Sequence, residues 1–334
     1  MLIGFYKKLI KNNIFERIVV FAICMSLLAG CGTTNDQEPF HLEENKGQNA
    51  TSYPYVVHTD SATWYLSKAD MEMIGEDAYL EGFRKIIENQ ESDFADAQKA
   101  LQGYLNKEIP PVNIFTDFCG KAEESRFHGG YYYGDARGIR LFTDWSAAEA
   151  VLLHEYVHYL SFTCAESPVS DGFWAEALAD YVSNLACENR MARTVNYGVS
   201  GEELQFYLDR GAVDPDTGQF DIRRYTCGTA EIMNSDAMLG QTYLSVAGTI
   251  SVISEQRREF RMITDLSYYE AASMMEYLIE NFGRDTVFSH WNIDGRDMKD
   301  VYGKSFTELY DDWRAWNLAR CNEYGLDLTI AEFK

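Results

Sequence analysis

The order of apolar and polar positions predicts strands in the first half of the chain and helices in the second. Alternating or short apolar runs predict strands at 55–58, 63–66, 112–116 and 138–142, and a glycine- and tyrosine-rich loop or hairpin at 129–134. Apolar residues at helical spacing predict helices at 70–88 and 93–105, and the chain after residue 145 is mostly helical. This order predicts an α+β fold, in which a small mixed sheet-and-helix lobe is followed by a mainly helical lobe.

The first thirty residues have the pattern of an export signal. A basic start at Lys7, Lys8, Lys11 and Arg17 is followed by the uncharged segment Ile18–Leu28. Eleven residues are too few to span a bilayer as a helix, whereas a basic segment, a short apolar segment and small residues are typical of a secretory signal peptide. The polar stretch that follows, to about residue 52, is expected to be a flexible tether.

The end of this signal also resembles the bacterial lipobox. The matching residues are Leu28-Ala29-Gly30-Cys31. The resemblance implies that residues 1–30 are removed, that Cys31 is lipidated, and that the protein is anchored to the outer face of the bacterial cell membrane. The alternative is an ordinary signal peptide followed by a chance cysteine.

The charge balance excludes one class of partner. The chain has 29 basic and 52 acidic residues, a net charge of −23, and removal of residues 1–30 would leave −26. Such a chain repels phosphate backbones, so nucleic-acid binding is not expected. Anionic lipid headgroups are repelled as well, and contact with a membrane is therefore expected only through the lipid on Cys31.

Five cysteines remain after the signal and the lipidation site are set aside. Export would permit one or two disulfides, but the number is odd, no CxxC spacing occurs, and the pairing stays open. Because nothing clusters at ligand spacing, a cysteine-ligated zinc site is not expected. These cysteines are Cys119, Cys164, Cys187, Cys227 and Cys321.

The chemistry of the chain is concentrated in His154-Glu155-Tyr156-Val157-His158. Ser146 and Glu149 form a capping-box pattern, so a helix is expected to begin there and to carry this segment. Residues four apart share a helix face, and both imidazoles can therefore bind one ion. Zn²⁺ accepts such ligands and activates a water molecule, whose proton Glu155 could take.

A second helical segment supplies two carboxylates. Seventeen residues separate His158 from Glu176, enough for a turn and a returning helix, and Glu176 could be the third ligand. Asp180 lies one turn later and could accept the spare N–H of a ligand imidazole. Both are embedded among Trp, Ala, Leu and Tyr residues, where an unpaired carboxylate would be costly to bury.

Together these segments resemble the gluzincin metallopeptidases, and most of all the bacterial peptidase MA-like domains. HExxH is followed by a helix similar to the family's Trp-x-x-Glu-x-Leu-Ala-x-Tyr pattern, with one residue instead of two between Trp174 and Glu176 and with Ala177 where glycine is usual. The resemblance implies a zinc cleft between the two lobes and hydrolysis of a peptide bond. It assigns His154, His158 and Glu176 as ligands, Glu155 as general base and Asp180 as the partner of His154.

A weaker part of the resemblance covers the C-terminal region. The segment from Tyr268 to Leu278 resembles a helix whose leading tyrosine stabilises the oxyanion, which implies that role for Tyr268. Tyr269, Tyr243 and His290 are alternatives. The resemblance also implies that the strand at 138–142 is an edge strand that pairs with the substrate backbone. It extends over 138–190 and, weakly, over 262–318.

We therefore expect one surface-anchored zinc peptidase acting on a peptide or protein. Residues 53–190 would form its α+β part with the zinc-binding helices, and residues 191–334 its helical C-terminal part. A non-catalytic lipoprotein that uses the same fold for binding or signalling is the main alternative. An anchored solute-binding protein would instead have two α/β lobes. The sequence leaves open the cleavage specificity, endopeptidase against aminopeptidase activity, and the oligomeric state.

Overall fold

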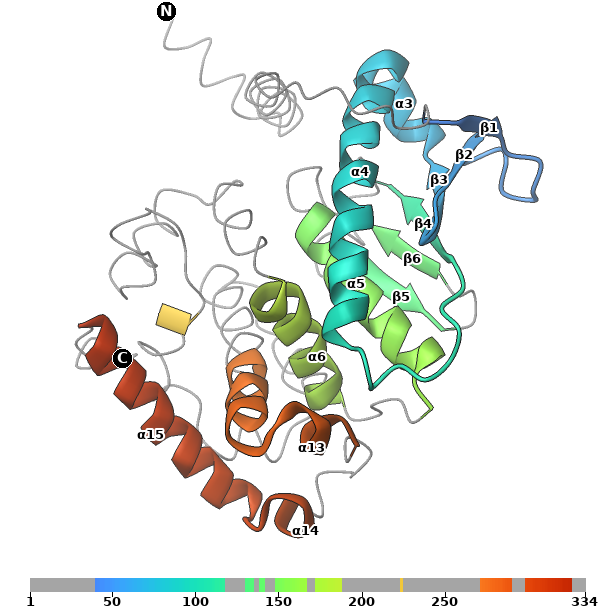
Figure 1. Cartoon of the computed structure of the whole chain (residues 1–334). Coiled ribbons are helices and arrows are strands. Elements are labelled where there is room, and N and C mark those ends of the chain that lie inside the picture. Colours follow the sequence, from blue (N-terminus) through green and yellow to red (C-terminus); the bar gives the residue numbers. More distant parts are fainter. Residues whose placement is uncertain are drawn as a thin grey trace, which may run out of the picture. The chain divides into compact units, whose positions relative to one another are not determined.

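The computed structural model describes residues 40–117, 130–134, 138–141, 148–166, 172–187, 223–224, 271–289 and 298–325. They fall into two compact units. The sheet unit contains the described residues of Met1–Asp93 and Pro110–Leu152, and the helical unit those of Phe94–Ile109 and Leu153–Lys334. A mixed sheet accompanied by helices confirms the α+β prediction (Figure 1). This division of the chain differs from the predicted one, which placed the zinc-binding helices in an α+β part ending at residue 190. The candidate ligands belong to the helical unit instead.

Six strands form one mixed sheet in the order β1-β2-β3-β4-β6-β5. The pairs β3–β4 and β4–β6 are parallel, and the pairs β1–β2, β2–β3 and β5–β6 are antiparallel. The strands are β1 (Leu42–Glu44), β2 (Tyr55–His58), β3 (Ala62–Leu66), β4 (Val112–Thr116), β5 (Gly130–Tyr133) and β6 (Gly138–Leu141). The predicted strands are thus confirmed to within one residue at each end. The strand β6 is not an edge strand, because β5 pairs with its outer side, and the expectation of an edge there is wrong.

The flexible tether that was expected to reach about residue 52 includes residues that are part of the fold. Residues 42–44 form β1, with Leu42 opposite Val57, and the turn that follows is held by Asn45, whose side-chain amide donates to the Tyr53 carbonyl at 2.6 Å. An exposed edge strand and an Asn-held turn have the same polar composition as a flexible linker. Composition alone could therefore not separate the two.

Two helices are divided differently from the prediction. The short helix α3 (Lys68–Ile74) is capped by Ser67 and ends at Gly75, whose φ of +96° suits glycine. The long helix α4 (Glu76–Ala100) then continues through the polar stretch at 88–93, where a boundary was expected. That stretch contains neither glycine nor proline, and Gln90 donates to Asp93 at 3.2 Å, with both residues buried.

One face of the sheet packs on α4. Ala62, Trp64 and Leu66 alternate along β3 and are fully buried, and the ring of Trp64 meets that of Phe83 edge-on at 5.7 Å. Close packing also explains Gly130 at the start of β5. A Cβ atom there would lie 2.9 Å from Val151 Cγ1, closer than real Cβ contacts, and 3.0 Å from the Arg140 carbonyl oxygen, which is tighter than most of them.

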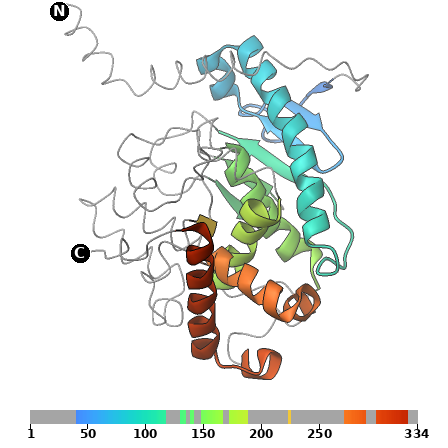
Figure 2. The same cartoon turned by 60° about the vertical axis from the view of Figure 1, so that its left-hand side comes forward.

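In the helical unit, residues 271–282 form a helix that packs against α15 (Phe306–Tyr324), as both views show (Figure 2). Trp313 Nε1 donates to Ser273 Oγ at 3.1 Å across this contact. A complete capping box at Ser305 and Glu308 starts α15, and Gly325 in the left-handed conformation ends it. The two short helices α13 (Arg284–Ser289) and α14 (Met298–Tyr302) lie between them in the sequence.

Candidate metal centre

Helix α5 (Ala148–Tyr159) carries the HExxH sequence. Apolar and aromatic side chains on most of its sides are buried, which is typical of a core helix. Its central Tyr156 is held by the last turns of α4: the ring stacks on Phe94 at 3.8 Å, and its hydroxyl accepts from Gln98 Nε2 at 2.7 Å. The backbone that presents both histidines is therefore fixed by packing.

Helix α6 (Gly172–Asp180) carries the two candidate carboxylates. Trp174, Ala177 and Leu178 are buried on the same helix, and Trp174 meets Phe306 of α15 edge-on at 6.2 Å. Both site helices continue directly as π-helix, α5 as η2 (Leu160–Cys164) and α6 as η3 (Tyr181–Ala186). Such turns are rare and frequently lie beside functional sites.

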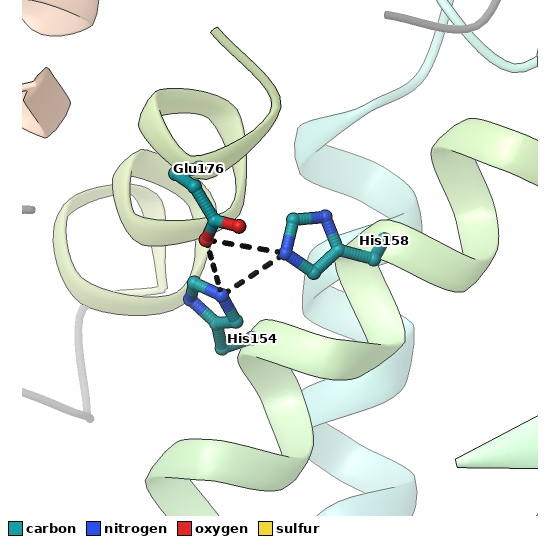
Figure 3. A group of neighbouring side chains, drawn as sticks. All are labelled: His154, His158 and Glu176. Carbon is teal, nitrogen blue, oxygen red and sulfur yellow. Dashed lines mark hydrogen bonds and ion pairs between the residues drawn. The ribbon is translucent and has the colours of Figure 1, made fainter. Parts of the chain in front are cut away.

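The three predicted ligands, His154, His158 and Glu176, meet between the two helices (Figure 3). Glu176 Oε2 lies 2.9 Å from His154 Nε2 and 3.3 Å from His158 Nε2, and the two Nε2 atoms are 3.0 Å apart. These atoms form the one group within the described residues that could hold a metal ion through three His, Cys, Asp or Glu side chains. We call these three residues the ligand trio.

The trio has dimensions that a small metal ion could fill. Zinc bonds of 2.0–2.1 Å at tetrahedral angles separate two ligand atoms by about 3.3 Å, close to the three observed distances. Glu176 Oε2 is also shielded from solvent, and none of the hydrogen bonds among the described residues satisfies it. A buried carboxylate oxygen in that state is costly, and a small cation between the three atoms would satisfy it.

Asp180 fixes the orientation of one ligand. His154 Nδ1–H donates to Asp180 Oδ1 at 2.9 Å, and the carboxylate is buried. Because the proton is on Nδ1, the Nε2 lone pair of the neutral imidazole faces the other two ligand atoms. This is the usual arrangement of a carboxylate behind a metal-binding histidine.

In the metal-free site, the histidines and the carboxylates shift each other's pKa values. Burial opposes a charge on His154, but the carboxylates of Asp180 and Glu176 outweigh it and hold the pKa of His154 well above its ordinary value of 6.5. Burial likewise favours the neutral form of Glu176, but His158 and His154 hold the pKa of this carboxyl well below its ordinary value of 4.5. The two carboxylates thus favour positive charge at the position where a cation would bind.

Glu155, the predicted general base, lies between the two histidines in the sequence and is 8% exposed. It is not part of the trio, and its role stays a prediction. Other predicted residues lie outside the described residues: Ser146, Tyr268 with its alternatives Tyr269, Tyr243 and His290, and the whole export signal with Cys31. Within the described residues, no helix is long and apolar enough to cross a membrane.

The cysteines are described only in part. Cys164, Cys187 and Cys321 are buried thiols, so no two of them form a disulfide with each other. Cys119 and Cys227 lie outside the described residues.

Two neighbours of the trio were not predicted. Asn184 on η3 donates a hydrogen bond to Asp180. The spacing of four residues between them could have indicated this contact in the sequence. Phe162 on η2 is 44% exposed, and its ring centre lies 6.2 Å from that of His158. It also follows His158 by four residues, but an isolated aromatic residue gave no reason to place it at the site.

Comparison with models of known protein families, with curated proteins and with solved structures finds no match for this chain. The resemblance to gluzincins therefore depends on the sequence motifs alone.

For a zinc ion held by the trio, as proposed below, we expect the stabilisation of the protein to increase with pH. In the metal-free protein, protonated His154 stabilises the fold; this contribution is complete below the ordinary pKa of 6.5 and is lost as the pH rises through the raised value. Zinc needs the neutral imidazole, so the proton competes with it most strongly at low pH. The zinc-induced rise in Tm should therefore grow between about pH 6 and about pH 8, as differential scanning calorimetry can measure. A rise that is equal throughout this range would contradict the prediction.

Proposed function

We propose that this protein is a zinc-dependent peptidase of the gluzincin type. The observation that carries the proposal is the ligand trio with its buried, unsatisfied carboxylate oxygen and with Asp180 behind His154. Two histidines and one glutamate leave a fourth position for water, which distinguishes a catalytic zinc site from a closed structural one. We place this site in a cleft of a gluzincin-like fold.

The residues of the chain divide the chemistry among them. His154, His158 and Glu176 would hold Zn²⁺, which when bound lowers the pKa of a water molecule and polarises the scissile carbonyl. Glu155 accepts the proton of the attacking water and delivers it to the leaving amine. Asp180 keeps His154 in the tautomer that binds metal. Tyr268 is proposed as the hydrogen-bond donor to the tetrahedral oxyanion.

The proposal also includes the cellular location of the protein. The signal pattern of residues 1–30 and the lipobox-like residues before Cys31 support an exported protein held at the outer face of a bacterial cell membrane by its lipid. The acidic composition supports the lipid as the only membrane contact and argues against nucleic-acid partners. The substrate would be a peptide or protein outside the cytoplasm.

Metal content and hydrolysis test this proposal together. Elemental analysis of the purified chain is expected to give about one zinc per chain. Hydrolysis of fluorescence-quenched peptide libraries should stop when a chelator removes the metal and return when zinc is added. Absence of zinc would overturn the proposal. Zinc without hydrolysis of any library would instead favour a non-catalytic, peptidase-like lipoprotein that binds or signals.

A further inference from the structure

Asn184 lies in the π-helix η3, four residues after Asp180. Its side-chain Nδ2 donates to Asp180 Oδ1 at 3.1 Å and to Ser183 Oγ at 3.2 Å. The oxygen of Asp180 that accepts from Asn184 is the one that also accepts from His154 Nδ1. A hydrogen-bonded chain therefore runs from Asn184 through Asp180 to His154, and the Nε2 atom of His154 belongs to the ligand trio.

The two hydrogen bonds to Asp180 Oδ1, from His154 and from Asn184, restrict the rotation of the carboxylate. The last torsion of an aspartate side chain is soft, so one hydrogen bond alone defines its orientation poorly. A second donor from another direction restricts the rotation and keeps the oxygen on the His154 side. Because the amide is neutral, it does so without competing as a cation for the charge of Asp180, which keeps its full attraction for the imidazole N–H.

We propose that Asn184 is a positioning residue of the metal centre, which acts through Asp180 to hold His154 Nε2 toward the metal. The inference rests on the proposed zinc site. It assigns to Asn184 no contact with metal or substrate. Its effect should therefore appear in the affinity for zinc and should depend entirely on the presence of the Asp180 carboxylate.

A double-mutant cycle on the full chain tests this dependence. Zinc affinity is measured at fixed pH by competition with a chromophoric chelator, for the wild type and for Asn184→Leu, Asp180→Ala and the double variant. Asn184→Leu keeps the shape of the side chain and removes the donor, and is expected to weaken zinc binding by about 10-fold, as for other residues behind metal ligands. In the Asp180→Ala background the same change should have no further effect.

Two comparisons separate positioning from folding. Asn281→Leu is a matched control, because Asn281 Nδ2 also donates to the residue four positions earlier in a helix, in this case to the Tyr277 carbonyl oxygen at 2.8 Å. It should leave zinc affinity unchanged. The Tm of each metal-free variant shows whether it folds, and Asn184→Ala replaces Asn184→Leu if the latter does not.

The outcomes are distinct. An unchanged affinity of Asn184→Leu, or an equal loss in the presence and absence of the Asp180 carboxylate, would overturn the role of Asn184 and leave the zinc site intact. A wild-type chain that binds no zinc would overturn the proposed function itself.

Discussion

Replacement of Glu155 by glutamine is expected to lower the rate of peptide hydrolysis by about 10²–10⁴-fold, which is the usual contribution of a general base. Glutamine has the same shape but cannot accept the proton of the attacking water. Because the trio does not include Glu155, zinc content and affinity should stay close to those of the wild type. The measurements are kcat on a peptide that the wild type cleaves, and elemental analysis of the same preparation.

The control for this experiment is another glutamate close by in the chain. Glu166 follows η2, is exposed, and accepts from Asn106 Nδ2 at 3.1 Å. Glu166→Gln should leave both hydrolysis and zinc content unchanged. Full activity of Glu155→Gln would mean that another group takes the proton. Loss of zinc from this variant would mean that Glu155 supports the metal rather than the reaction.

Replacement of Glu176 by glutamine is expected to weaken zinc binding by more than about 100-fold, beyond the 10–100-fold range of residues behind the ligands. The change removes the only anionic ligand of the trio, and Oε2 of Glu176 is one of the buried oxygens that no hydrogen bond among the described residues satisfies. Isothermal titration of the metal-free protein with zinc measures the effect. Hydrolysis at low zinc concentration should disappear with the metal.

The loss of zinc affinity should be smaller for residues that lie further from the metal. Glu176→Gln is expected to cost more than Asp180→Asn, and Asp180→Asn more than Asn184→Leu, because the three stand progressively further from the metal. Glu280→Gln is a matched control, since Glu280 is exposed and accepts from Arg320 at 2.9 Å. Equal zinc affinity in Glu176→Gln and Glu280→Gln would exclude Glu176 as a ligand.

The strands β2, β3, β4 and β6 and the ligand trio could be predicted from the sequence because short-range patterns determine both. The alternation at 112–116 reflects one buried face, and β4 has these bounds. The four-residue spacing of His154 and His158 places both on one helix face, and the only long-range step was the return of Glu176 on a second helix. That step was predictable because a carboxylate among apolar residues needs a partner.

Features that depend on tertiary context could not be predicted. The polar run at 88–93 suggested a helix boundary, but burial of Gln90 and Asp93 beside each other lets α4 continue. The break falls instead at Gly75, where the backbone adopts a positive φ. Likewise the resemblance to gluzincins implied that β6 is an edge strand, and nothing in the sequence of β6 itself shows that β5 pairs beside it. Asn184 was overlooked because an asparagine on a helix is usually a surface residue.

The π-helices after α5 and α6 also affect how this chain can be compared with others. A π turn closes its hydrogen bond five residues back instead of four, so it contains one residue more than an α turn. Relative to an uninterrupted helix, the segments that begin at Leu160 and Tyr181 therefore each correspond to an insertion. A homologue with plain helices there would align with this chain only across single-residue gaps. In such an alignment the residues up to His158 and up to Asp180 would match without a gap. A gap of one residue would be needed soon after each of them.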